Sequence, residues 1–153
     1  MICVILTASD DVEALARLLT QLTPAAAEGL VRQVAVVGAA GACADLAEDA
    51  GADIFAAGAF GAAAAKARGP WLAGLPSNAV LVRDWMERVA GHLARGDSAP
   101  ARLVARSGWL GLGGRPEGWL APKRLAPSAV LVEQDFQRLA RRGGRRLRVL
   151  DRR

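Results

Sequence analysis

The chain has 153 residues, a formal net charge of +5 and a hydrophobic content of 52%, with only 5% aromatic residues. This length suits one domain with a substantial core, since a chain of roughly 150 residues buries about two thirds of its unfolded surface. The two cysteines form no spacing motif and the single histidine, His92, is expected at the surface near a helix end, so the sequence supports neither a zinc centre nor a Ser-His-Asp triad. No window approaches the ~20 consecutive apolar residues of a membrane span.

The chain opens with a strand and a helix. The run from Ile2 to Thr7 is continuously apolar, as expected of a parallel strand covered on both faces. No basic segment precedes it, and Asp10 and Asp11 follow soon after, so we expect no signal peptide and a cytoplasmic protein. Either aspartate can cap the next helix, which we expect to end at Thr23-Pro24.

Strands and helices then alternate up to residue 95. We predict strands over 34–37 and 53–56, helices over 42–50 and 59–68, and a tight turn at 38–41. Alternation of this kind is typical of right-handed βαβ units in a parallel sheet. The sequence therefore predicts an α/β domain with a mostly parallel sheet and helices on both of its faces.

Residues 67–93 contain the turn at which we expect chemistry. They comprise a helix end, a Gly69-Pro70 break, a buried strand over 71–75, the turn Pro76-Ser77-Asn78, and an amphipathic helix from Val82. In open α/β sheets ligands bind at the carboxyl ends of the strands. The turn after this strand is therefore the predicted functional position.

After residue 96 the pattern changes. We predict a strand over 101–105, a loop or loose hairpin over 107–122, a strand over 129–132, a helix over 133–142 and an apolar ending over 147–150. Eight arginines lie between Arg138 and Arg153, opposed only by Asp151. The basic character is thus a C-terminal feature.

The central segment resembles that of family-2 glycosyltransferases with the GT-A fold. These proteins carry an ARG-x-W-L-x-x-L segment, an acidic turn and a helix opening near a tryptophan, which correspond here to Ala67-Arg68-Gly69, Trp71-Leu72, Leu75 and Trp85. The resemblance implies a Rossmann-like three-layer sandwich. It also implies a UDP-type or GDP-type nucleotide sugar as ligand, with a divalent metal, Mn or Mg, if activity is retained.

The resemblance divides the single domain, 1–153, into three parts. Residues 1–95 correspond to a nucleotide-binding-like βα half, 96–137 to a shortened acceptor-side region, and 138–153 to a basic C-terminal tail.

The chain departs from the family pattern where charge is needed. The metal-binding acids are replaced at Ser77 and Asn78, and an amide oxygen is a weak ligand for a hard cation. We therefore assign no metal ligand and regard Asn78 as a degenerate metal position, although a shifted alignment would let Asp84 or Asp53 supply the carboxylate. By resemblance, the nucleotide-binding candidates are Thr7, Ser9, Gly38, which replaces an aspartate that reads the base, Ser77 and Asn78.

Two acids of the last predicted helix are catalytic candidates. Glu133 and Asp135 resemble the acidic pair from which these transferases draw a general base. In a second alignment, which we prefer, Glu133 is only an acid at a helix N-terminus, where the dipole favours it. The sequence thus predicts a glycosyltransferase-like protein of polysaccharide or glycolipid assembly that is weakly active or inactive.

Two other functions remain open. A non-catalytic interaction module could bind a protein partner or an anionic membrane surface, peripherally at the inner membrane face. No reader motif supports nucleic acid. The Gly38-x-x-Gly41 turn leaves a dinucleotide-binding domain as a weaker alternative. The arginines assigned to the membrane or anion contact are Arg141, Arg142, Arg145, Arg146 and Arg148.

Overall fold

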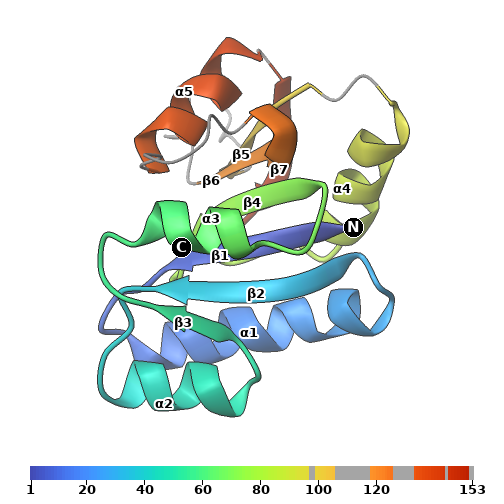
Figure 1. Cartoon of the computed structure of the whole chain (residues 1–153). Coiled ribbons are helices and arrows are strands. Elements are labelled where there is room, and N and C mark those ends of the chain that lie inside the picture. Colours follow the sequence, from blue (N-terminus) through green and yellow to red (C-terminus); the bar gives the residue numbers. More distant parts are fainter. Residues whose placement is uncertain (97–98, 106–117, 126–132, 144, 152–153) are drawn as a thin grey trace.

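A computed structural model describes residues 1–96, 99–105, 118–125, 133–143 and 145–151. Its centre is a seven-stranded sheet in the order β3-β2-β1-β4-β6-β5-β7 (Figure 1). The strands are β1 (Ile2–Thr7), β2 (Val31–Val37), β3 (Asp53–Phe55), β4 (Trp71–Pro76), β5 (Ala101–Ala105), β6 (Gly118–Pro122) and β7 (Arg145–Leu150). Among these strands β6 alone runs antiparallel to its neighbours, β4 and β5.

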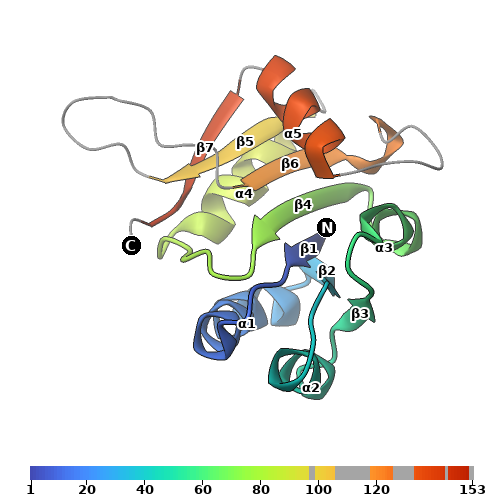
Figure 2. The ribbon, with the colours of Figure 1, turned by 90° about the vertical axis from the view of Figure 1, so that its left-hand side faces the viewer.

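Helices cover both faces of the sheet, which confirms the predicted three-layer α/β architecture. On one face, α1 (Val12–Ala27), α2 (Ala42–Asp49) and α4 (Trp85–Ala94) pack against an aliphatic layer. On the other face, α3 (Phe60–Lys66) and α5 (Glu133–Arg142) pack over an aromatic cluster (Figure 2). A short 3-10 helix, Lys123–Leu125, follows β6. No helix among the described residues is long and apolar enough to cross a membrane.

The aromatic cluster joins elements from both halves of the chain. Trp119 of β6 stacks on Phe136 of α5 with ring centroids 4.4 Å apart, and Phe60 of α3 contacts both rings at 5.7 and 5.6 Å. Trp119 and Phe136 are completely buried. The indole lies so close over β4 that a Cβ at Gly74 would overlap it, so this strand position requires glycine.

Three predicted boundaries in the first half are wrong. Strand β2 begins at Val31 and not at residue 34, because Val31 pairs with Ile2 of β1. Helix α1 continues through Pro24 to Ala27 because its apolar face continues there, and Leu22 and Ala25 are buried on either side of the proline. Helix α4 begins at Trp85 and not at Val82, because the backbone N–H of Val82 donates to Val149 O at the end of β7 (2.9 Å). Burial and strand pairing thus outweigh the local signals.

Two further expectations are corrected by burial. Residues 118–122, predicted as part of a loop, form the completely buried strand β6. His92 is only 2% exposed, with its ring against Trp71 (centroids 5.7 Å apart) and its Nε2 2.9 Å from Ala99 O. The predicted strand over 129–132 and the rest of the predicted loop, 107–117, lie outside the described residues.

The segment predicted as a basic tail contributes to the folded core. The boundary at residue 138 falls inside α5, and β7 pairs along β5. Val149 and Leu150 of β7 are buried on the α4 side of the sheet.

Candidate functional site

The carboxyl ends of β1, β2 and β4 lie side by side. In the parallel register Thr7 of β1 is flanked by Val37 of β2 and Pro76 of β4. Two backbone bonds of 2.9 Å continue this alignment beyond the strands, from Ser77 N to Thr7 O and from Ala8 N to Val37 O. The structure therefore brings the predicted residues Thr7, Gly38 and Ser77 to one edge of the sheet.

Ser77 lies in the interior of this edge. Its side chain is fully buried, and its Oγ accepts a hydrogen bond of 2.9 Å from the backbone N–H of Ser9. The two serine hydroxyls are also 2.9 Å apart, and Cys43 Sγ donates to Ser9 O at 3.4 Å. Ser77 thus holds the connection between β1 and α1 in place.

Thr7 connects this edge to the C-terminal half. Its Oγ1 donates a hydrogen bond of 3.0 Å to Glu133 Oε2, at the first residue of α5. Both groups are accessible to solvent, and Thr7 itself is exposed. Asp135, the other predicted acid, lies 3.8 Å from Arg138 on the same helix. The structure therefore brings Glu133 into contact with the strand end.

Gly38 and Asn78 complete the predicted set. Gly38 has φ +82°, a left-handed conformation that strains an L side chain, and its N–H donates to Phe55 O at 2.9 Å. Asn78 is half-buried directly after Ser77. Position 38 therefore presents only backbone groups at this end of β2.

The residues at this edge do not fit a divalent cation. Hard cations prefer several anionic oxygens, whereas the carboxylate that the structure places at Thr7 is Glu133. No cluster of three or more His, Cys, Asp or Glu residues that could hold a metal occurs in the part of the chain that the structure describes. The alternative carboxylates lie elsewhere, since Asp53 accepts a hydrogen bond from Gln33 (2.5 Å) at the start of β3, and Asp84 pairs with Arg88 (2.6 Å).

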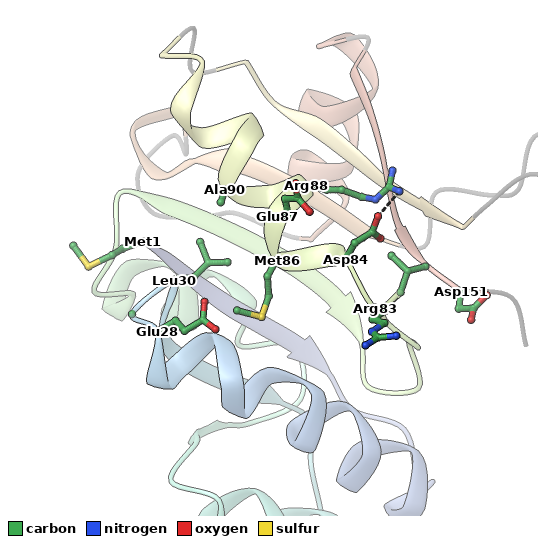
Figure 3. Close-up of a pocket in the computed structure, with 12 residues that line it drawn as sticks. Met1, Glu28, Leu30, Arg83, Asp84, Met86, Glu87, Arg88, Ala90 and Asp151 are labelled. Atoms are coloured by element: carbon green, nitrogen blue, oxygen red, sulfur yellow. Dashed lines mark hydrogen bonds and ion pairs between the residues drawn. The ribbon is translucent and has the colours of Figure 1, made fainter.

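A separate hollow of about 1280 Å³ lies between the end of α1 and the first turns of α4 (Figure 3). Leu30, Val82 and Met86 give it apolar walls, and the Asp84–Arg88 pair stands at its rim. Of the predicted site residues only Asp84, the alternative metal ligand, lines it, and none of the nucleotide-binding, catalytic or membrane-contact candidates does. The hollow is therefore independent of the strand ends.

Comparison with known proteins shows which solved structures share this fold. No protein-family model and no curated protein sequence matches the chain. Solved structures do match, among them glucosyl-3-phosphoglycerate synthase from Mycobacterium tuberculosis in complex with Mn2+, uridine-diphosphate and phosphoglyceric acid. The similarity has a TM-score of 0.62 at 16% sequence identity over 82% of this chain and 56% of that chain.

Two further complexes of the same synthase match over more of the chain. The complex with Mn2+, uridine-diphosphate and glucosyl-3-phosphoglycerate gives a TM-score of 0.64 at 18% identity, over 92% of this chain and 66% of that one. The complex with Mn2+, uridine-diphosphate-glucose and phosphoglyceric acid gives 0.64 at 19% identity, over 94% and 67%.

The chain has a GT-A fold. It spans between about half and two thirds of the length of these solved chains. The predicted fold class is thereby confirmed, and at these identities the likeness concerns the fold alone.

Sequence reasoning named the individual residues at the strand ends but not their contacts. The pairing of Thr7 with Glu133 joins residues 126 positions apart, and no periodicity reveals it. The sequence does contain a local indication that Ser77 is buried, because this serine directly follows a buried apolar strand.

Proposed function

We propose that this chain is a glycosyltransferase-like domain that binds a nucleotide sugar of the UDP or GDP type at the carboxyl ends of β1, β2 and β4, and that it is weakly active or inactive. The observation that carries the proposal is the network at this edge, in which Thr7, Ser9 and Ser77 are linked by hydrogen bonds and Glu133 supplies a carboxylate. Ser9, Gly38 and Asn78 offer a hydroxyl, backbone groups and an amide to the ligand.

The low activity follows from the chemistry of these groups. A divalent ion contributes several kcal/mol of charge stabilisation when a diphosphate leaves, and the neutral groups at Ser77 and Asn78 cannot hold one in place. Glu133 is a suitable proton acceptor because it already accepts a hydrogen bond from a hydroxyl, that of Thr7. Asp135 remains a weaker candidate for the same role, since its carboxylate faces Arg138.

The solved relatives support this class of ligand. The synthase has been solved in complexes with uridine-diphosphate and uridine-diphosphate-glucose, together with Mn2+ or Mg2+. We propose that this chain binds the same class of ligand and that it acts in polysaccharide or glycolipid assembly.

Calorimetric titration with UDP-glucose and GDP-mannose, each with and without manganese, tests the proposal. We expect binding of one of the two, little dependence on manganese, and very slow transfer or hydrolysis. Thr7→Val should weaken binding, whereas Thr20→Val, which alters an exposed threonine on α1 that bonds Ala16 O (2.8 Å), should not. If neither nucleotide sugar binds, the proposal is wrong.

A second candidate function is attachment to an anionic membrane surface at the inner membrane face. Arg141 and Arg142 are exposed in the last turn of α5, Arg146 and Arg148 are exposed on β7, and Arg145 is half-buried beside them. Each basic residue near such a surface contributes on the order of 1 kcal/mol.

Vesicle co-sedimentation tests this second function. The full chain should sediment with vesicles that contain phosphatidylglycerol and not with pure phosphatidylcholine. A variant carrying Arg141→Gln, Arg142→Gln and Arg148→Gln should lose this binding, and equal sedimentation of both proteins would reject the arginines as the contact.

A further inference from the structure

One row of residues crosses the sheet on the face covered by α3 and α5. Strand register places Ile5 beside Gly74, Gly74 beside Trp119, Trp119 beside Arg102, and Arg102 beside Arg146. Ile5 and Trp119 are completely buried, whereas Arg102 is half-buried and Arg146 is exposed. The row therefore leads from the core to two neighbouring arginines at the edge of the sheet.

Within the described part of the chain, no carboxylate compensates the charge of these two arginines. Neither forms an ion pair with a carboxylate among the residues that the structure describes. Two guanidinium groups at paired positions of the parallel strands β5 and β7 repel each other. In addition, the Nε of Arg102 is buried and has no hydrogen-bond partner in the described part of the chain. A buried charged donor of this kind is costly to leave unpaired.

We propose that Arg102 and Arg146 form a phosphate-binding site, which takes either a soluble phosphate ester or the phosphate of a lipid headgroup. Guanidinium groups match phosphate oxygens with paired hydrogen bonds. A phosphate between the two side chains removes their repulsion and pairs with both guanidinium groups.

The surroundings of the pair favour an anion. The chain turns from α5 into β7 at Gly143, which packs against Pro100 just before β5. This turn places the exposed Arg141 and Arg142 of α5 a few residues before β7 and adds positive potential to the same region. The pair is separate from the candidate nucleotide site, because β4 and β6 lie between β5 and β1.

A purely structural role for Arg102 makes a different prediction. Its aliphatic stem could cover the edge of Trp119 while the charged head reaches water. If Arg102 had only this role, phosphate would neither bind nor raise the midpoint of thermal unfolding. The effect of phosphate therefore distinguishes a binding role from a structural one.

The test uses the full chain and inorganic phosphate at constant ionic strength, with chloride as the replaced anion. We expect saturable binding by calorimetry and a rise in the midpoint of thermal unfolding. Arg102→Gln and Arg146→Gln should each weaken binding by about tenfold or more, the loss of one charged hydrogen bond. The control Arg17→Gln, at an exposed position of α1 on the opposite face, should bind as the unmodified chain does.

A second readout separates the site from a packing effect. In phosphate-free buffer, Arg146→Gln should unfold at the same temperature or higher, because it removes like-charge repulsion. Lack of phosphate binding by the unmodified chain, or unchanged binding by both variants, would overturn the proposal.

Vesicles distinguish the two sources of phosphate. Vesicles of phosphatidylcholine with phosphatidic acid are compared with vesicles holding the same fraction of phosphatidylglycerol. A preference for phosphatidic acid that both variants lose assigns the site to a lipid headgroup. Phosphate binding without that preference assigns it to a soluble ester, and either result supports the site.

Discussion

Two regions of the sheet differ in the charge of their side chains. At β1, β2 and β4 the strand ends meet in hydroxyl and backbone groups, with Glu133 reaching Thr7 from α5. At β5 and β7 the sheet ends in arginines. Residues 1–96 contain ten acidic and seven basic side chains, whereas residues 97–153 contain thirteen basic and five acidic ones. This chain with a GT-A fold thus has little charge at the carboxyl ends of β1, β2 and β4 and concentrates positive charge at β5 and β7.

Replacing Trp119 should have the largest effect, because its ring joins the two parts of the chain. Trp119→Ala removes the contacts with Phe60 and Phe136 and leaves a cavity, at a cost of about 3–5 kcal/mol in the free energy of unfolding. Urea denaturation followed by circular dichroism measures this, with Trp71→Ala, at a half-buried position, as the milder control. A loss below about 1 kcal/mol would mean that the two regions do not share this core.

The buried hydroxyl of Ser77 should rank next. Ser77→Ala leaves the backbone N–H of Ser9 without its acceptor, which costs about 1–3 kcal/mol. Ser9→Ala is the matched control, because it removes only the hydroxyl contact and keeps the backbone bond to Ser77. Equal losses in the two variants would contradict the positioning role of Ser77.

Cys3 gives a pH-dependent effect that is absent near neutrality. Burial in β1, with a smaller contribution from the charge of Asp53, raises the pKa of the Cys3 thiol from 9.0 to about 11. Because the folded-state pKa is the higher one, this contribution to stability is complete below pH 9 and is lost as the pH rises towards 11.

The size of that loss is roughly 2 kcal/mol at pH 10.5. Comparing denaturation at pH 8 and pH 10.5 for the unmodified chain and for Cys3→Ala isolates it, since other titrating groups are common to both. The same pH dependence in both proteins would contradict the burial of this thiol.

The contact between Thr7 and Glu133 should contribute least to stability, because it is exposed to solvent. Glu133→Gln should change the free energy of unfolding by less than about 1 kcal/mol. Any residual sugar transfer should nevertheless fall, since the amide cannot accept a proton. A large loss of stability with unchanged transfer would make Glu133 a structural residue, and Gln134→Ala, at the adjacent exposed position, serves as control.

The sequence revealed the first half of the fold better than the second. Continuous apolar runs and glycine or proline breaks indicated β1, β4 and the alternation up to residue 95. The strand β6 was missed because Gly118–Pro122 lies in a glycine-rich stretch and pairs only with strands distant in sequence. The sequence places His92 at the surface because no local pattern indicates its contact with Trp71, 21 positions earlier.

The candidate site was predictable as a list of residues but not as a geometry. The hydroxyls at Thr7, Ser9 and Ser77 follow apolar strands, which made their common edge foreseeable. That Ser77 points inward, and that Glu133 reaches Thr7 across 126 residues, depends on packing that no local pattern encodes.

The manganese dependence of nucleotide-sugar affinity tests the central claim most directly. We expect the unmodified chain to bind its nucleotide sugar with the same affinity, within about twofold, with and without manganese, since neutral groups do not retain the cation. Asn78→Asp should introduce a dependence on manganese. A tenfold or greater strengthening of binding to the unmodified chain by manganese would contradict the account.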